Sequence, residues 1–142
     1  MSSMDKVAVV TGGASGIGEG CVRKLVSLGY WVEILDQERE QSARLVNELN
    51  SSSLRTKHHV VDVADAHSVD RCAQQILEEH GRIDVLVTSA GILESSANIL
   101  DMDMVSHDRV WQINYHGTVH CVRSFGKIMR AALRGAIVTV GS

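Results

Sequence analysis

Glycines near the amino terminus are spaced in a way that could hold a diphosphate. Residues 11–18 read TGGASGIG and separate an apolar β-branched run, residues 7–11, from a segment with helical spacing of apolar residues. Gly12 permits a tight turn, Gly16 lets the main chain approach a pyrophosphate, and Gly18 lets a helix pack closely on the sheet. The first turn of that helix offers free N–H groups and the positive end of its dipole. We therefore expect phosphate binding without Lys or Arg.

An acidic residue follows at the distance expected for recognising a ribose. Asp36 lies eighteen residues after Gly18, at the end of a second apolar run, residues 31–35. Its carboxylate can accept both hydroxyl groups of an adenosine ribose, at about 1.5–3 kcal/mol for each hydrogen bond. It would repel a 2′-phosphate, and neither Ser15 nor Gln37 brings a compensating positive charge. The pattern predicts NAD rather than NADP, and the alternative is that Asp36 merely caps a helix.

The elements that position these residues alternate along the chain. We expect strands over residues 7–11, 31–35, 58–61, 85–88 and 136–140, and helices over residues 16–28, about 38–49 and about 106–133. One face of a further helix is marked by Val69, Cys72, Ala73, Ile76 and Leu77. His58 and His59 are expected to straddle the start of a strand. Continuous β-α alternation predicts an α/β doubly wound parallel sheet, a Rossmann fold of three layers, in one domain over residues 1–142.

Composition narrows the class of protein. The 142 residues are 44% hydrophobic and 22% charged, with a formal net charge of -3, which fits a single cored domain and gives no basic patch for nucleic acid or acidic membranes. No apolar stretch reaches the roughly 20 residues that span a bilayer, and residues 1–6 do not resemble a secretory signal, so we expect a cytoplasmic protein. Three widely spaced cysteines indicate reduced thiols on helices.

With the spacing G-x3-G-x-G after a strand-ending Thr, the sequence resembles the short-chain dehydrogenase/reductase superfamily over essentially its whole length. Asp62 and Val63 look like the pair that contacts adenine in that family. Ser89-Ala90-Gly91 is similar to the family's Asn-Ala-Gly, which braces the sheet beside the cofactor. Because Ser replaces Asn, we expect a weaker brace.

The resemblance also implies catalytic residues. Asn114 is similar to the helix asparagine whose main-chain carbonyl holds a water of the proton relay, and a buried structural Asn is the alternative. Ser142, after the strand at residues 136–140, looks like the catalytic serine. The residues expected to bind the cofactor are Gly12, Ala14, Ser15, Gly16, Ile17, Gly18, Asp36, Asp62, Val63, Ser89, Ala90 and Gly91.

The family's catalytic Tyr-x-x-x-Lys is not found in these 142 residues. Tyr30 and Tyr115 are followed four places later by Ile34 and Val119, so both are interpreted as packing residues. The chain is therefore expected to be truncated after the fifth strand and inactive by itself, although its parent would be an NAD-dependent oxidoreductase acting on an alcohol or carbonyl. The alternative is a non-catalytic dinucleotide-binding module. A methyltransferase is disfavoured by the glycine spacing, and no motif of a serine hydrolase or P-loop nucleotidase occurs.

Two further pairs of residues have spacings that could indicate a metal site or acid/base catalysis, but neither pair supports such a site. His116 and His120 have the i, i+4 spacing of metal ligands, but no third ligand lies near them in the sequence, so we expect no metal. Asp101 and Asp103 are better explained as helix caps or solvated residues than as an acid/base pair. The apolar circumference of residues 106–133 and the uncovered fifth strand predict a homo-oligomer, and in the family this helix contributes to the dimer interface.

Overall fold

The computed structural model describes residues 5–94 and 98–141. The strands are β1 (Val7–Thr11), β2 (Trp31–Asp36), β3 (Thr56–Val60), β4 (Val85–Thr88) and β5 (Ala136–Thr139). The helices are α1 (Gly16–Ser27), α2 (Arg39–Leu49), α3 (Ala66–His80), α4 (Met104–Trp111) and α5 (Thr118–Ala131), with a 3-10 helix at Ile99–Asp101 and a π-helix at Gln112–Gly117. All strand pairs are parallel, in the order β3-β2-β1-β4-β5. The expected doubly wound α/β sheet is confirmed.

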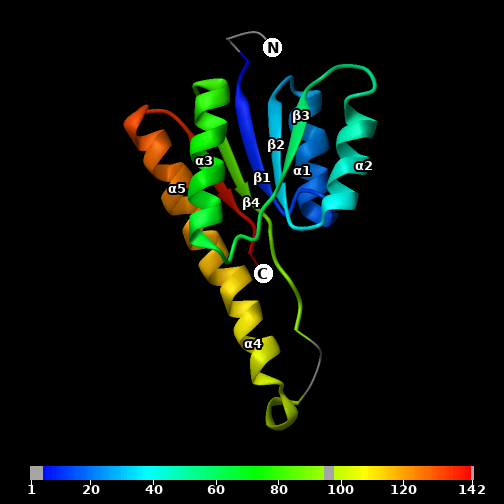
Figure 1. Ribbon diagram of the computed structural model, residues 1–142, viewed down its shortest axis with the longest axis vertical. Helices are drawn as coiled ribbons and strands as arrows, with labels where there is room; N and C mark the ends of the chain where they lie inside the picture. The colour runs from blue at the N-terminus through cyan, green and yellow to red at the C-terminus, as the bar shows by residue number, and fades with distance from the viewer. Residues whose placement is uncertain (1–4, 95–97, 142) are drawn as a thin grey trace.

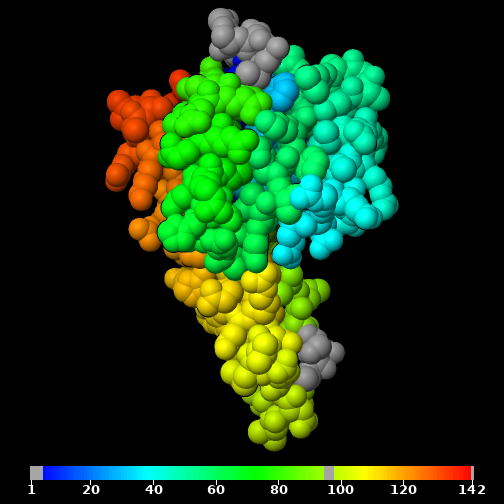
Figure 2. Space-filling view, in the orientation of Figure 1, coloured from blue at the N-terminus to red at the C-terminus, as the bar shows by residue number. Residues whose placement is uncertain are grey.

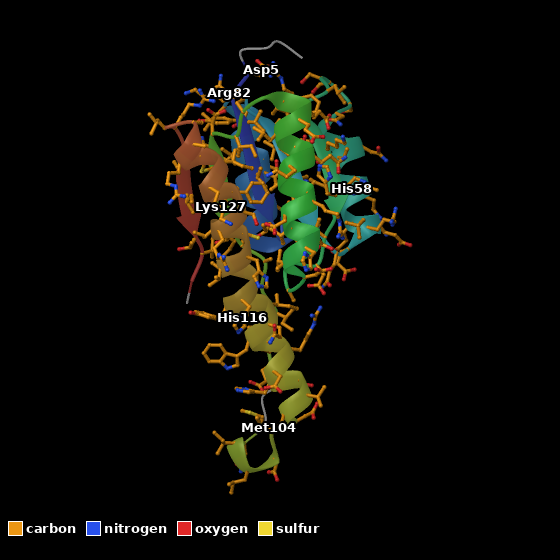
Figure 3. All side chains as sticks on the ribbon, turned by 60° about the vertical axis from the view of Figure 1, so that its left-hand side comes forward. Asp5, His58, Arg82, Met104, His116 and Lys127 are labelled. Carbon is orange, nitrogen blue, oxygen red and sulfur yellow. The ribbon has the colours of Figure 1, made fainter. Side chains whose placement is uncertain are left out.

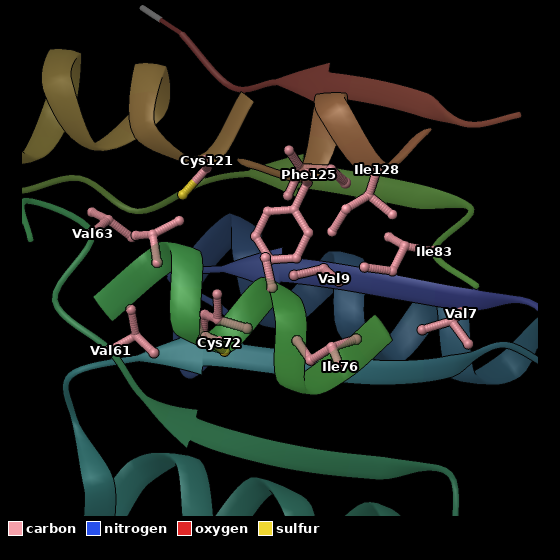
Figure 4. Close-up of a cluster of buried hydrophobic side chains, with 14 of the residues drawn as sticks. Val7, Val9, Val61, Val63, Cys72, Ile76, Ile83, Cys121, Phe125 and Ile128 are labelled. Carbon is pink, nitrogen blue, oxygen red and sulfur yellow. The ribbon is translucent and has the colours of Figure 1, made fainter. Parts of the chain in front are cut away.

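The sheet is covered on both faces. Figure 1 shows α1 and α2 on one side and α3 and α5 on the other. Along β1, Val7 and Val9 belong to the apolar cluster beneath α3 and α5, while Ala8 and Val10 belong to the cluster beneath α1 and α2. This alternation explains why the strand is apolar at every position, since both of its faces are buried. Phe125 of α5 projects into the middle of the first cluster (Figure 4).

The expected start of the third strand is wrong. β3 begins at Thr56 rather than at residue 58, so His58 and His59 lie inside the strand and not across its start. The polar residues of this strand concealed its beginning, because it neighbours only β2 and its side chains are mostly half-buried or exposed. Asp103 caps α4 by accepting hydrogen bonds from two main-chain amides, and Asp101 is exposed in the 3-10 helix, so the two fit the expected capping and solvated roles.

The expected single helix over residues 106–133 is instead three segments. α4 begins at Met104, and a π-helix separates it from α5. The space-filling view shows α4 on a narrow extension beyond the wider body of the molecule (Figure 2), and the labelled Met104 and His116 lie along this part (Figure 3). Tyr115 contacts the rings of Trp111 and His116, in agreement with its interpretation as a packing residue, although it is 54% exposed and this packing lies at the surface.

Within the described residues, the outer strand β5 pairs with β4 alone and is exposed along its whole length. Ile137 and Val138 are 39% and 54% exposed. This agrees with the expected uncovered apolar edge. Among the described residues, no helix is long and apolar enough to cross a membrane.

The cysteines provide a test of the packing. Cys72 and Cys121 are buried and Cys21 is partly exposed, all three being free thiols. Burial raises the pKa of both Cys72 and Cys121 to about 12, and for Cys72 the charge of Glu33 adds to the effect. We expect a thiol-titrating disulfide reagent at pH 8 to modify only Cys21 rapidly, because thiolates are the reactive form. Rapid labelling of all three thiols before denaturant is added would contradict this packing.

Candidate functional site

A cavity of about 560 Å³ opens at the carboxyl edge of the sheet. Its wall comes from the turn after β1 and from the ends of β2, β3 and β4, together with one residue of the π-helix and one that follows β5. The lining residues are Gly12, Ser15, Gly16, Ile17, Leu35, Asp36, Gln37, Glu38, Val61, Asp62, Val63, Ser89, Ala90, Gly91, Ile92, Leu93, Ile113 and Val140. Parallel strands of a doubly wound sheet bind ligands at this edge.

The glycine turn is shaped by close approaches of the main chain. Gly12 has φ +62°, and a methyl group there would lie 2.7 Å from Cα of Ala90. A methyl group at Gly18 would lie 2.1 Å from the carbonyl oxygen of Gly12. Gly16 differs: its φ is +55°, but apart from its chain neighbours and its own helix backbone, no atom of the described residues lies within 4 Å of the position of a Cβ. The first two glycines are therefore required by packing within the chain, while Gly16 leaves open space beside the cavity.

The amino terminus of α1 faces the same cavity through Ser15, Gly16 and Ile17. Ser15 is the N-cap in an extended conformation, and its side chain makes no capping hydrogen bond. The amides of the first turn have no acceptor within their own helix. This arrangement fits a phosphate group, which would accept hydrogen bonds from these amides.

Asp36 closes the adjoining wall at the end of β2. Its Oδ2 accepts a hydrogen bond of 3.0 Å from the amide of Ala14, and its Oδ1 accepts one of 3.0 Å from the amide of Glu38. The carboxylate thus ties the glycine turn to the end of β2. No Lys or Arg occurs among the residues that line the cavity in the described part of the chain.

Asp62 has a partner that the sequence did not reveal. Its Oδ2 accepts a 2.7 Å hydrogen bond from Nη2 of Arg109 on α4, and its Oδ1 accepts one of 3.0 Å from the amide of Ala64. The Asp62 and Arg109 side chains are 38% and 43% exposed, so the ion pair lies at the rim of the cavity. Each oxygen of the Asp62 carboxylate therefore already accepts one hydrogen bond. A further donor, such as the amino group of adenine, would have to share an oxygen with Arg109 or with the amide of Ala64.

The segment after β4 is braced by Thr11 rather than by the side chain of Ser89. The hydroxyl of Thr11 accepts hydrogen bonds from the amides of Ser89 at 3.2 Å and Ala90 at 3.1 Å. Thr11 is 1% exposed. This bracing role was missed, although the strand-ending Thr was visible in the sequence.

Asn114 lies in the π-helix and does not line the cavity. Its Oδ1 accepts a 2.8 Å hydrogen bond from the amide of Ile92, and its Nδ2 donates one of 2.9 Å to the carbonyl of the same residue. Its own carbonyl oxygen accepts a hydrogen bond of 3.1 Å from the Thr118 hydroxyl. The Asn114 side chain thus links the π-helix to Ile92, a residue that follows β4 and lines the cavity.

The structure brings most of the expected binding residues together. Ala14 and Gly18 do not line the cavity, because Ala14 is buried behind it and Gly18 packs on Gly12. Ser142 lies outside the described residues. The lining residues that sequence reasoning missed include Leu35, Glu38, Val61, Ile92 and Ile113; they carry no motif, and only the position after a strand end or on the facing helix places them here.

Known proteins are similar to this chain in sequence and in structure. The model of the family described as short chain dehydrogenase matches residues 6–142. A 2,3-dihydro-2,3-dihydroxybenzoate dehydrogenase of Bacillus subtilis is 33% identical over 137 residues, which are 96% of this chain and 52% of that protein. A D-threitol dehydrogenase of Mycolicibacterium smegmatis is 36% identical over 137 residues, with the same shares of 96% and 52%.

Solved structures give the same result. An NAD⁺-bound xylitol dehydrogenase superposes with a TM-score of 0.92 at 26% identity, covering 96% of this chain and 53% of that one. The NADP-bound structure of ElxO superposes with a TM-score of 0.90 at 30% identity, covering 98% and 56%. The chain spans about half the length of the proteins it matches. It belongs to the short chain dehydrogenase family.

Proposed function

We propose that the chain is the NAD-binding part of an oxidoreductase that transfers a hydride between an alcohol or carbonyl substrate and the nicotinamide ring. The observation that carries this proposal is the position of Asp36, whose carboxylate lines the cavity beside the glycine turn. A carboxylate has about four lone-pair positions. Main-chain amides use one on each oxygen, so one on each oxygen remains for the 2′- and 3′-hydroxyl groups of a ribose.

The remaining contacts follow from the wall of the cavity. The amides of Gly16, Ile17 and Gly18 would hold the pyrophosphate, and the open space at Gly16 lets it approach. Asp62 and Val63 would lie beside the adenine, with the main chain of Val63 against the ring. Apolar lining by Leu35, Val61, Ile92 and Ile113 would exclude water. The list of proposed contacts is completed by Gly12, Ser15, Ser89, Ala90 and Gly91. Ala14 would act indirectly, because its amide donates to the Asp36 carboxylate.

The chemistry needs groups beyond this cavity. When bound, the nicotinamide would accept or donate the hydride. Ser142 would steady the substrate oxygen, and Asn114 would position the segment at Ile92 and take part in a proton relay through its carbonyl. The substrate would be a small alcohol or carbonyl compound. The exposed Trp111 and Tyr115 on the long helix support a homo-oligomer through residues 106–133.

Cofactor choice is tested by calorimetric titration with NAD and NADP. We expect the unaltered chain to prefer NAD at least tenfold, because the carboxylate repels a 2′-phosphate. Asp36→Asn should weaken NAD binding about tenfold to a hundredfold, because hydrogen bonds to a charged group contribute about 1.5–3 kcal/mol. The difference between the affinities for NAD and NADP should also be smaller in this variant than in the unaltered chain.

Glu38→Ala is the matched control, because Glu38 is an acidic neighbour that lines the same cavity. Its affinity for NAD should change less than threefold. The melting temperature of each variant separates lost binding from lost folding. Equal affinities of the unaltered chain for NAD and NADP, or an unchanged affinity in Asp36→Asn, would refute the assignment.

A second candidate function is a dinucleotide-binding module without catalysis. This candidate concerns the 142 residues by themselves, which contain no Tyr-x-x-x-Lys and so supply no such pair to take up the alcohol proton. We expect the pure 142-residue chain to bind NAD but to form no NADH with a panel of polyols and cyclic dihydrodiols, as followed by NADH absorbance. Sustained NADH formation by protein of verified mass would overturn this expectation.

A further inference from the structure

A buried carboxylate lies between two imidazoles on the α3 face of the sheet. Glu33, in the middle of β2, has a side-chain exposure of 0%. Its Oε2 lies 2.7 Å from Nε2 of His59 on β3, and its Oε1 lies 2.5 Å from Nε2 of His80, the last residue of α3. Trp31 also donates a 2.7 Å hydrogen bond to Oε1. None of these residues lines the cavity at the carboxyl edge.

A second carboxylate completes the group. Glu79 precedes His80, and single donor atoms of Glu33, Glu79 and His80 all lie within 4.8 Å of one another. The side chain of Glu79 is 36% exposed, whereas that of His80 is 1% exposed. The group is thus buried on the side of Glu33 and accessible on the side of Glu79.

We propose that Glu33, Glu79 and His80 bind a divalent transition-metal ion of the Zn²⁺ type. One imidazole nitrogen and two carboxylate oxygens are donors that Zn²⁺ accepts, and water reaching the Glu79 side would fill the fourth position. The two carboxylates neutralise the charge of the ion. On binding, the ion takes the place of the hydrogen bond between Nε2 of His80 and Oε1 of Glu33. A doubly protonated His80 loses its Nε2 proton to solvent, whereas a neutral His80 binds the ion through Nε2 with its single proton on Nδ1.

The neighbouring residues orient these ligands. Trp31 and His59 hydrogen-bond to Glu33, and Nζ of Lys57 lies 2.6 Å from Oε2 of Glu79. Such outer contacts fix the orientation of ligating carboxylates. With ligand bonds of about 2.0–2.1 Å, donor atoms around tetrahedral Zn²⁺ lie about 3.3 Å apart. Binding therefore widens the 2.5 Å separation of Nε2 of His80 and Oε1 of Glu33 and draws in the exposed ligand Glu79, whose donor atom lies within 4.8 Å of the other two.

The site would stabilise the fold rather than take part in hydride transfer. It links the middle of β2 to the last turn of α3, two elements far apart in the sequence. An ion that binds only the folded chain raises its stability by mass action. The expected effect is a higher melting temperature, without a change at the dinucleotide cavity.

The experiment uses the 142-residue chain stripped with a chelator and titrated with Zn²⁺ or Mg²⁺. We expect calorimetry to give one Zn²⁺ per chain and a melting temperature several degrees higher, with no shift from Mg²⁺, which prefers oxygen ligands. Glu79→Gln should weaken Zn²⁺ binding at least tenfold, and His80→Gln should abolish it. Because Glu79 is exposed, its variant should fold even if His80→Gln does not.

His116→Gln is the matched control, since it removes an exposed imidazole from the i, i+4 pair with His120. It should leave Zn²⁺ affinity unchanged. The proposal is overturned if Zn²⁺ does not bind saturably, or if Glu79→Gln leaves the affinity unchanged. Weaker binding in His116→Gln with unchanged binding in Glu79→Gln would place the ion on the surface histidines instead.

Discussion

Replacing Gly18 with Ala is expected to destabilise the chain by about 3 kcal/mol and to abolish measurable NAD binding. The added methyl group would lie 2.1 Å from the carbonyl oxygen of Gly12. Because the obstacle is main chain, no side chain can rotate away, and relief requires α1 to move from the glycine turn. Urea unfolding followed by circular dichroism gives the loss of stability, and calorimetric titration gives the loss of affinity.

Gly20→Ala is the matched control on the same helix. A methyl group at Gly20 would meet no atom within 4 Å. Removing a glycine from a helix interior stabilises the fold by about 0.5–1 kcal/mol, so this variant should be slightly more stable and bind NAD normally. If Gly18→Ala behaves like Gly20→Ala, the close packing of α1 on the glycine turn is wrong.

Replacing Glu33 with Gln is the second substitution with a large expected effect. Glu33 receives hydrogen bonds from Trp31, His59 and His80 in a fully buried position. Removing one partner of a buried charged pair costs about 3–5 kcal/mol, so we expect a loss of about 3 kcal/mol for this conservative change. Urea unfolding at pH 7 with a chelator present measures it without a contribution from bound metal.

The effect should depend on pH in a stated direction. Burial by itself would raise the pKa of Glu33, but hydrogen bonds from His59 and His80 outweigh it and lower the pKa below its ordinary value of 4.5. A carboxyl group with a lowered pKa contributes stability above pH 4.5 and loses it as the pH falls through the folded-state value. The difference between the unaltered chain and Glu33→Gln should therefore shrink below pH 4.5.

Glu48→Gln provides a control for the charge change. Glu48 pairs with Arg23 at 2.7 Å, but its side chain is 61% exposed, and exposed ion pairs contribute little to stability. Its substitution should leave the unfolding midpoint nearly unchanged. An equal loss of stability in Glu33→Gln and Glu48→Gln would show that burial of Glu33 does not matter.

The helical segment from α4 to α5 shows the limit of predictions from local apolar spacing. Its apolar spacing predicts helical structure over residues 106–133, and helical structure spans this range as far as Ala131. The π-helix at Gln112–Gly117 was not predicted, because one extra residue in a turn leaves the apolar spacing nearly intact. The contacts of that segment are tertiary: a Cβ at Gly117 would lie 2.5 Å from Cγ2 of Val63, and Asn114 bonds to Ile92.

The sequence by itself determined the succession of strands and helices along the chain, the glycine turn, and the position of Asp36 at the end of the second strand. These features depend on neighbours within a few residues or on the regular alternation of elements, and both are visible as spacing. Only the tertiary structure decided the partners of the charged groups: Arg109 for Asp62, and His59 and His80 for Glu33. Those partners lie 26 to 47 residues apart, and no periodicity links side chains that meet only after the sheet has formed.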